Sequence, residues 1–310
     1  RMLNLQRLRL LRELHRRGTM AEVARALAYT PSTVSQQLAL LERETGTALL
    51  ERVGRRVRLT DAAIALVEHT EAVLARLELA ESDLQAARPD APATIRVAAF
   101  PTVLASLAPT ALTLLAERHP QLRVELHDRE VEEAYDELRA HAFDLVVGES
   151  YPGAPEPPHP GIELAPLRPD ALRLVLPLEG PLRRVPGEFA ELAEAPWAFD
   201  TRTSRMGVWA LGRCRAAGFE PRILVETPEP LLQAHLVRSG HVVAIIAELI
   251  AAPLLEGTRL VELPGDPHRL LFTAVRAGSA GRPAIRAVRE ALADAARMQA
   301  PPRPADRLAR

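Results

Sequence analysis

Strand-forming and helix-forming segments alternate along residues 93–300, and this alternation limits the fold more than any other feature of the chain. The first half predicts strands at Thr94–Phe100, Leu122–His127 and Phe143–Gly148, with a helix at Thr102–Arg118 and another ending at about Ala140. The order β-α-β-α-β requires a parallel sheet with helices on its faces.

A second α/β pattern follows a proline-rich loop at Tyr151–Pro160. Two α/β lobes joined by two crossings are typical of hinged binding proteins, whose ligand lies at the carboxyl ends of the strands. We expect lobe I at about 93–168 and 268–298, lobe II at about 169–267, and a disordered tail at 301–310. The remaining predicted strands are Ile162–Leu167, Leu172–Leu176, Trp197–Asp200, Arg222–Glu226, Val242–Ile246 and Leu271–Val275, and the remaining helices are Met206–Ala217, Glu229–Ser239 and Ala284–Met298.

The first 60 residues have a different pattern, which predicts two short helices and a longer one. Gly18 ends the first helix, and Thr19 caps the second in a capping box with Glu22. Thr30 caps the third, which begins at Pro31 and runs to about Glu44, with Gly46 beyond its end. Helices separated by such tight turns make a helix-turn-helix unit.

Two features of this unit favour contact with a nucleic acid. The third helix begins Pro31-Ser32-Thr33-Val34-Ser35-Gln36-Gln37, mostly small or amide side chains able to bond base edges or phosphates. Residues 49–59 then alternate apolar residues with arginines around Gly54, which predicts a β-hairpin, or wing. An arginine-rich turn by itself is usually only a solvent-exposed charged turn. The DNA-binding interpretation therefore depends on the helix-turn-helix that precedes it.

The charge of the chain is divided along its length. Residues 1–60 hold 12 arginines and five acids, a formal charge of +7, while residues 61–310 carry −8. A basic head on an acidic body is the asymmetry expected of a nucleic-acid-binding domain attached to a non-binding one. The chain holds no lysine, as expected if its coding DNA is rich in G and C. The use of arginine in place of lysine is therefore not evidence for DNA binding.

Residues 61–88 predict a long helix that begins after the cap Thr60 and stops before Pro89. Its apolar positions recur at alternating steps of four and three residues, which is a weak heptad seam. We interpret this helix as a dimerisation linker; packing along its own body is the alternative. The seam consists of Leu66, Thr70, Val73, Leu77, Ala80 and Leu84.

Composition and motifs exclude several other classes. The longest apolar stretches, Val242–Ala247 and Leu249–Leu255, are far shorter than the ~18–20 residues that span a bilayer, and the arginine-rich start has no apolar signal-peptide core. We therefore expect a cytoplasmic protein with no membrane partner. No His-Glu-x-x-His pair, nucleophile elbow, P-loop or dinucleotide fingerprint is present, so we expect no enzyme, metal or cofactor. Cys214, the single cysteine, lies between two arginines, and redox sensing through it is a minor alternative.

With these features, the chain resembles the LysR-type transcriptional regulators. The resemblance covers nearly the whole chain, from about Leu3 to Met298, and is most specific in the first 61 residues. It implies an α/β fold with an N-terminal winged helix-turn-helix, a long linker helix and a two-lobed periplasmic-binding-protein-like effector domain. The matching residues are Gly18-Thr19, Ala24–Leu27, Val34-Ser35-Gln36-Gln37-Leu38, Leu41-Glu42, Gly46, Leu49-Leu50, Arg52, Val57–Asp61, Ile95-Arg96-Val97, Leu107–Pro120 and Phe143-Asp144-Leu145.

The resemblance also implies site residues. The DNA contacts would be Thr30, Pro31, Ser32, Thr33, Ser35 and Gln36, with Arg52, Arg55 and Arg56 on the wing or nearby backbone. The effector contacts would be Phe100, Pro101, Thr102, Val103, Asp128, Glu149, Asp200, Thr201, Arg202, Thr203, Thr227 and Pro228, with Arg129 and Arg205 beside them.

The types of these effector residues indicate a ligand chemistry. The helix that begins at Thr102 could hold an anionic oxygen, and Arg202 and Arg205 could pair with a carboxylate. Asp128, Glu149 and Asp200 would accept hydrogen bonds from a ligand. A site with both anion-binding groups and carboxylates would suit a zwitterion.

The sequence therefore predicts a homodimeric or homotetrameric DNA-binding transcriptional regulator, modulated by an unknown small-molecule effector between the lobes. Its expected partners are double-stranded DNA, a second copy of itself and RNA polymerase. The alternative is a small-solute-binding protein with a redox- or ligand-independent architectural DNA-binding head. A solute-binding protein by itself would leave the basic head unexplained, and an architectural DNA protein would not need two α/β lobes.

Overall fold

The computed structural model describes residues 3–53, 56–86, 93–250, 255–299 and 306–307. The chain divides into two compact units, Arg1–Leu84 and Gln85–Arg310. Among the described helices, none has the length and apolar character needed to cross a bilayer.

The first unit contains the three predicted helices. Gly18 and Gly46 end the first and third with φ angles of 77° and 66°, in the left-handed region that glycine adopts without strain. Thr19 Oγ1 accepts the Glu22 N–H, whereas the return bond from the Glu22 side chain is not among the described bonds, so only half of the predicted capping box is formed. The helices are α1 (Leu5–Arg17), α2 (Met20–Ala26) and α3 (Pro31–Thr45).

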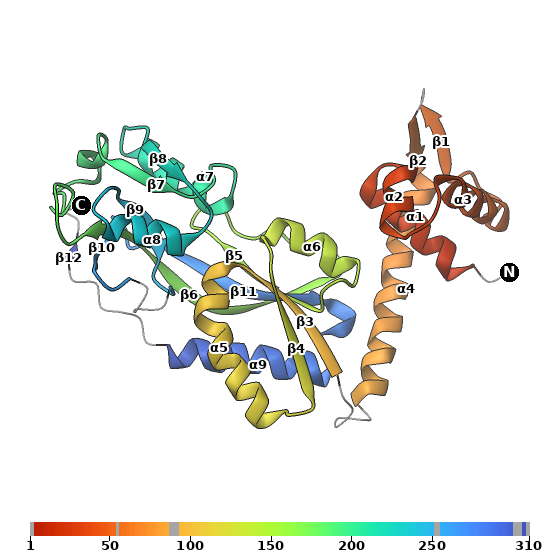
Figure 1. The fold of residues 1–310 in the computed structure, drawn as a ribbon. Coiled ribbons are helices and arrows are strands. Elements are labelled where there is room, and N and C mark those ends of the chain that lie inside the picture. The colour runs from red at the N-terminus through yellow and green to blue at the C-terminus, as the bar shows by residue number, and fades with distance from the viewer. Residues whose placement is uncertain (1–2, 54–55, 87–92, 251–254, 300–305, 308–310) are drawn as a thin grey trace. The chain divides into compact units, whose positions relative to one another are not determined.

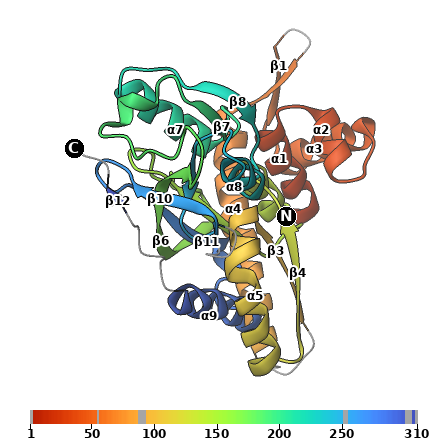
Figure 2. The ribbon, with the colours of Figure 1, turned by 60° about the vertical axis from the view of Figure 1, so that its left-hand side comes forward.

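A small apolar core and a hairpin complete this part of the unit. Leu11, Leu14, Val23, Val34 and Leu41 are buried together with other residues of the three helices. The predicted wing is confirmed as an antiparallel pair, β1 (Leu50–Val53) and β2 (Arg56–Leu59), with Leu50 opposite Leu59. Figure 2 shows the pair projecting from the helices.

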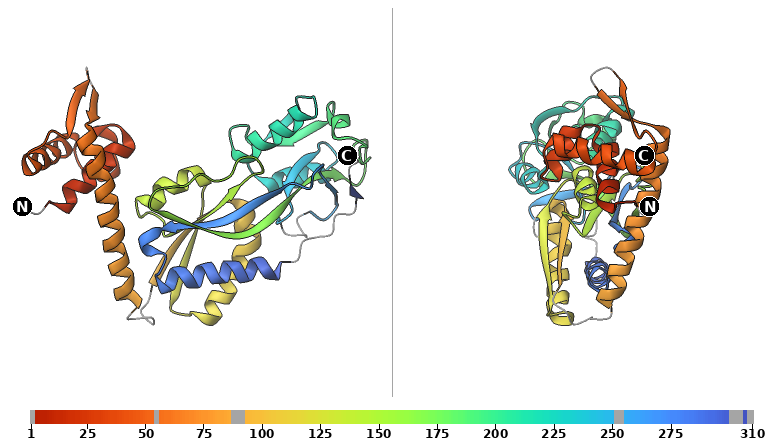
Figure 3. Two further views of the ribbon diagram at one scale, coloured as in Figure 1. Left: turned by 180° about the vertical axis from the view of Figure 1, so that it is seen from behind. Right: turned by 90° about the vertical axis from the view of Figure 1, so that its right-hand side faces the viewer.

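The predicted linker is one long helix, α4 (Asp61–Ala86), seen from behind in Figure 3. Positions 87–88, the last of the predicted linker, lie outside the described residues. Ala63 and Val67 are buried in the core of the first unit, while Val73, Leu77 and Leu84 of the seam are exposed. An apolar seam exposed in one chain is available to a second helix.

Lobe I has the predicted β-α-β-α-β order. Its three strands are parallel in the order β5-β3-β4, with α5 and α9 on one face of the sheet and α6 on the other (Figure 1). The elements are β3 (Ala93–Ala99), α5 (Pro101–Arg118), β4 (Leu122–Asp128), α6 (Val131–Arg139), β5 (Leu145–Ser150) and α9 (Pro283–Met298).

The two strands predicted at Ile162–Leu167 and Leu172–Leu176 are one strand, β6 (Ile162–Pro177), and that prediction is wrong. Pro169, which has no N–H to donate, lies between the two predicted strands. A register shift in the pairing with β11 (His268–Arg276), between Leu271 and Phe272, accommodates this segment, and Asp170 lies opposite Arg269. β6 and β11 therefore carry the chain between the lobes as paired strands (Figure 3).

Lobe II is built around the second half of β6. β9 and β10 pair antiparallel with β6, and β7 pairs in parallel with β8. β10 was not predicted from the sequence, because its short mixed segment has no clear alternation. The elements are a 3₁₀ turn at Phe189–Leu192, β7 (Pro196–Phe199), α7 (Arg205–Ala216), β8 (Arg222–Glu226), α8 (Pro230–Arg238), β9 (Ala244–Ala247) and β10 (Thr258–Glu262). A second 3₁₀ turn, at Ala277–Ser279, lies in lobe I between β11 and α9.

The tail differs from the predicted disorder at two positions. Asp306 and Arg307 form a short strand, β12, parallel to Val261 and Glu262 of β10. The edge of β10 offers unpaired backbone groups that an extended segment can satisfy. Positions 301–305 and 308–310 lie outside the described residues.

Candidate DNA-binding and effector-binding sites

The start of α3 presents a set of exposed polar groups. The Thr30 hydroxyl accepts the Thr33 N–H at 3.2 Å and lies 2.8 Å from both the Ser32 and Thr33 hydroxyls. Pro31, Ser32, Ser35 and Gln36 are exposed, while Val34 points into the core. These hydroxyls lie at the positive end of the helix dipole, where a phosphate oxygen would be attracted.

Two adjacent amides on α3 have different surroundings. Gln37 Oε1 accepts a hydrogen bond from Arg7 Nε at 3.1 Å, which ties α3 to α1. The Gln36 side chain is exposed on the neighbouring position. The structure therefore gives Gln37 a role in packing and leaves the amide of Gln36 available for a base edge.

The wing is attached to α3 through Glu42. One carboxylate oxygen of Glu42 accepts the backbone N–H groups of Leu49 and Leu50, at 2.8 and 3.0 Å. Arg52 lies in β1 and Arg56 in β2, and Arg55 lies outside the described residues. Arg58, which was not proposed as a contact, pairs with Glu51 across the hairpin at 2.5 Å.

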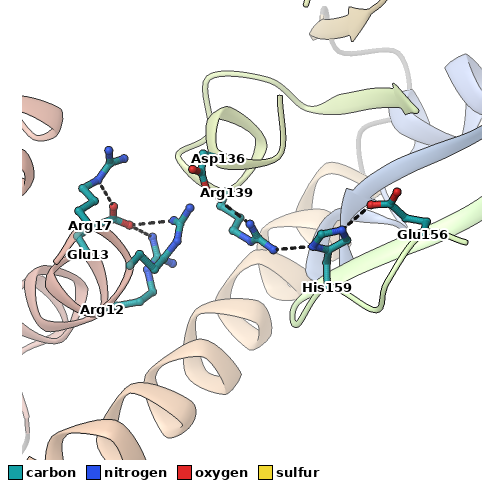
Figure 4. Close-up of polar contacts among 8 residues, drawn as sticks. Arg12, Glu13, Arg17, Asp136, Arg139, Glu156 and His159 are labelled. Atoms are coloured by element: carbon teal, nitrogen blue, oxygen red, sulfur yellow. Dashed lines mark hydrogen bonds and ion pairs between the residues drawn. The ribbon is translucent and has the colours of Figure 1, made fainter. Parts of the chain in front are cut away.

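A buried carboxylate holds several arginines of α1. Glu13, only 3% exposed, accepts hydrogen bonds from Arg12 and Arg17 at 2.8 Å and from Arg16 at 3.2 Å (Figure 4). Burial raises the pKa of Glu13, but the hydrogen bonds from Arg17 and Arg12 and the charge of Arg16 outweigh it and hold the pKa below its usual value. These arginines stabilise the unit, so the +7 charge of the head is not all available to DNA.

In the second unit, strand ends of both lobes meet at one cavity. Six of the twelve effector residues implied by the resemblance line it: Phe100, Pro101, Thr102, Glu149, Asp200 and Pro228. They lie at the end of β5 or just after β3, β7 and β8, as expected at the carboxyl ends of strands. Arg205, which the sequence suggested as a partner for a carboxylate, lines the cavity as well. The lining residues that sequence reasoning missed are Glu130, Val131, Tyr151, Ser204, Met206, Pro230, Gln233, Ile245, Ile246, Ala247 and Arg269.

The other six implied residues lie elsewhere. Val103 is buried in the core of lobe I, Asp128 is exposed at the end of β4, and Thr203 lines a separate groove beside α7. Arg202, expected to bind a carboxylate, is paired with Glu226 at 3.1 Å. Thr201 and Thr227 are half-buried beside the strand ends and are not part of the cavity lining.

The cavity contains a buried ionic network centred on Arg269. Its guanidinium lies 2.6 Å from Glu149 and 2.7 Å from Asp170, and 5.1 Å from the centre of the Phe100 ring. Tyr151 donates its hydroxyl to Glu149 at 2.9 Å. Burial lowers the pKa of Arg269, but the charges of Asp170 and Glu149 outweigh it and raise the pKa. Arg269 is therefore a permanent cation whose charge is largely compensated.

Asp200 is an acidic group of the cavity whose ionisation is disfavoured. Burial is the main cause that raises the pKa of Asp200 to about 6, and the nearby charge of Glu149 adds to it. The Ser204 hydroxyl, at 2.7 Å, and the Thr201 N–H oppose the shift. A ligand that donates hydrogen bonds or positive charge to Asp200 would favour its ionised form.

The proline-rich loop is attached to both lobes near this cavity. Glu156 pairs with Arg205 at the start of α7, and it lies 2.6 Å from His159 Nε2 (Figure 4). Arg139 of α6 contacts His159 Nδ1 at 3.3 Å. Because arginine only donates, Nδ1 accepts, which places the proton of a neutral imidazole on Nε2, facing Glu156. The same Arg205 also donates to the carbonyl of Glu149.

The cavity is small in this conformation. Its volume is about 50 Å³, whereas typical ligand pockets measure roughly 300–1,000 Å³. An effector of ordinary metabolite size therefore requires the lobes to move apart before it can enter.

The remaining features are the potential metal ligands and Cys214, for which redox sensing was a minor alternative. Among the described residues, no group of three potential metal ligands is present. Cys214 is buried in the core of lobe II, and burial, together with the charge of Glu220, raises the pKa of its thiol to about 12. The charge of Arg213 lowers the pKa of the thiol, but burial outweighs it, so a thiol in these surroundings stays protonated.

Comparisons with known proteins agree with this architecture. Residues 5–64 match the bacterial regulatory helix-turn-helix protein, LysR family, and residues 90–297 match the LysR substrate-binding domain. A probable HTH-type transcriptional regulator, LtrA of Klebsiella pneumoniae, is 42% identical over 57 residues, which is only 18% of each chain.

Solved structures share the whole fold at lower identity. A full-length OxyR variant of Pseudomonas aeruginosa is 20% identical with a TM-score of 0.60, and the match covers 96% of this chain and 99% of that one. Full-length CbnR in complex with its target DNA is 22% identical with a TM-score of 0.52, covering 94% and 99% of the two chains. The fold class and family predicted from the sequence are thereby confirmed. The domain matches together span most of the sequence, and the chain belongs to the LysR family of transcriptional regulators.

Proposed function

We propose that the protein binds a specific duplex DNA site through the start of α3 and regulates transcription from it. The exposed polar start of α3 carries this proposal, because it sets hydroxyl and amide groups at the positive end of a helix. The contacts on base edges and phosphates are assigned to Thr30, Pro31, Ser32, Thr33, Ser35 and Gln36, with phosphate contacts from Arg52, Arg55 and Arg56 of the wing.

A helix-turn-helix generally reads two half-sites as a pair. The exposed seam of α4 supports association of this chain with a second copy, as a homodimer or a pair of dimers. The relevant side chains are those of Val73, Leu77 and Leu84.

The second part of the proposal concerns the cavity between the lobes. A small-molecule effector with donor groups facing Asp200 would bind there and change the balance between two arrangements of the lobes. Binding shifts such a balance only by the difference in affinity for the two arrangements. The cavity lining supports this role, because residues from the ends of four strands and from the crossing strand β11 meet in it.

The remaining parts of the proposal follow from family membership. A regulator bound at a promoter acts beside RNA polymerase, which we propose as its partner, and it acts in the cytoplasm, where the bacterial chromosome lies. We propose no catalytic activity, because the matched family consists of regulators.

The decisive experiment measures binding to the DNA upstream of the protein's own gene. Fluorescence anisotropy with excess competitor DNA should show specific binding that weakens with salt. Gln36→Ala should weaken specific binding about tenfold, since one good amide–base contact is worth roughly 1–3 kcal/mol. Gln37→Ala, which removes the amide tied to Arg7, is the matched control and should change base preference far less.

Two results would count against this proposal. Binding that competitor DNA removes completely would favour the architectural head of the alternative hypothesis. Equal loss of specificity in the Gln36 and Gln37 variants, at unchanged thermal stability, would show that Gln36 does not read a base.

A further inference from the structure

A large groove lies beside α7 and adjoins the cavity between the lobes, with which it shares Tyr151 and Arg205. Its volume is about 620 Å³, within the range of roughly 300–1,000 Å³ that is usual for small-molecule sites. One wall is the proline-rich loop, with Pro152, Pro155 and Pro157, and the other is α7, with Val208 and Trp209. Apolar surface therefore dominates both walls.

The α7 wall is an apolar stripe without a covering partner among the described residues. Val208 is 59% exposed and, together with Trp209, forms an apolar surface that faces the prolines of the loop across the groove. Trp209 is half-buried, and its ring lies 6.0 Å from that of Tyr151, which holds it in place.

A glycine keeps the middle of this stripe open. Gly212 lies one turn beyond Val208 inside α7, where glycine costs about 1 kcal/mol relative to alanine. A Cβ added at Gly212 would meet no atom within 4 Å, so packing does not require its small size. The effect of the glycine on the lobe is to leave the groove deeper at this point.

One end of the groove carries a positive charge. Arg213 lines the groove and donates from Nη2 to the carbonyl of Pro264 at 2.8 Å. Within the described part of the chain it forms no ion pair, in contrast to Arg205, whose charge is paired with Glu156. A neutral carbonyl does not compensate the guanidinium charge, so the groove favours an anion.

We propose that this groove is a second small-molecule site, which binds an organic anion with a flat apolar body. The flat body would lie between Trp209 and the prolines of the loop, and the carboxylate would pair with Arg213. The ligand differs from that of the cavity between the lobes, whose lining includes the carboxylates of Glu130, Glu149 and Asp200. Val208, Gly212 and Arg213 of α7 line the groove and not that cavity, so they distinguish the two sites.

The test uses the full-length protein and naphthoate as the probe, with uncharged naphthamide for comparison. Isothermal titration calorimetry should show naphthoate binding at least tenfold more tightly than naphthamide. Arg213→Gln should weaken naphthoate binding about tenfold and leave naphthamide unchanged. Arg215→Gln removes the same charge from a position on α7 that is not part of the groove lining, and should leave both affinities unchanged.

Filling the groove gives the second arm. Gly212→Leu should weaken the binding of both probes more than tenfold while the thermal midpoint stays equal or rises, because leucine favours a helix more than glycine does. Equal affinity for the two probes, unchanged naphthoate binding in Gly212→Leu, or no binding at all would overturn the proposal. A fall in the molecular mass of the assembly caused by Gly212→Leu would also overturn it, since the groove would then be an interface between copies.

Discussion

At the scale of the residue, Glu13 shows why a count of charges overstates what faces a ligand. Three arginines of α1 bond to this one buried carboxylate, and Arg7 is paired with Glu44. Removing Glu13 would leave those cations close together without compensation, which is the costly way to break a buried ion pair. The basic composition of the head thus serves its own fold as well as DNA.

Asp200 gives the first prediction at this scale. Its pKa in the folded protein, about 6, lies above the ordinary value of 3.8, so the folded state binds the proton more tightly. Stability is therefore lost as the pH rises between these values, because a buried carboxyl must ionise. Asp200→Asn should raise the free energy of unfolding by about 1–2 kcal/mol near pH 7.5 and by much less near pH 4.5.

Urea unfolding of the full chain at the two pH values measures this difference. Asp128→Asn, at an exposed position at the end of β4, is the control and should change stability by less than about 0.5 kcal/mol at either pH. A gain for Asp200→Asn that is the same at both pH values would show that burial of the charge is not its cause.

Residues that act through their neighbours in the sequence were predictable, and those that act over long separations were not. Thr19, Thr30, Gly18 and Gly46 were identified because capping depends on residues one turn away. Arg269 was missed, because its partners Asp170 and Glu149 lie 99 and 120 positions away. No pattern in the neighbouring sequence predicts that an arginine will be buried.

At the scale of the element, α4 supplies a prediction about assembly. Leu77 is 44% exposed on the seam, and a charge there would have to be buried between two paired helices. Leu77→Glu should therefore shift the protein to a lower mass in light scattering at micromolar concentration. Ala72→Glu adds the same charge to an exposed position outside the seam and should leave the mass unchanged. The same mass for wild type and Leu77→Glu would refute pairing through this seam.

Strands were harder to predict than helices for a physical reason. The helices of the first unit have caps and an apolar face, and both signals agree. β6 was predicted as two strands on either side of Pro169 because local patterns were used. The strand is held by pairing with β11 along its first part and with β9 and β10, on opposite sides, along its second. Long-range pairing overrides the preference of one residue.

At the scale of the whole effector domain, the contact between Arg205 and Glu156 opposes separation of the lobes. Burial raises the pKa of Glu156, but its hydrogen bonds with Arg205 and His159 outweigh burial and lower the pKa. The ionised form is thus favoured, and the contact is lost only when the pH falls through this lowered pKa.

Removing that charge should loosen the domain locally. Glu156→Gln should speed amide hydrogen exchange in residues 151–160 and in the first turn of α7 about tenfold, equivalent to about 1.4 kcal/mol of easier opening. Glu163→Gln breaks the pair with Arg289 within lobe I and should leave exchange in those segments unchanged. Unaltered exchange in Glu156→Gln would mean that the loop is held by its other contacts.

The unbroken run of β6 from one lobe to the other has a mechanical consequence. A continuous strand paired with β11 has no swivel, so relative rotation must be spread as small changes in twist over many peptide units. The force that returns the lobes to their resting arrangement then grows with the angle of rotation. Ligands of increasing size would then bend the paired strands by increasing angles. The angle between the lobes would therefore depend on the size of the bound ligand as well as on its presence.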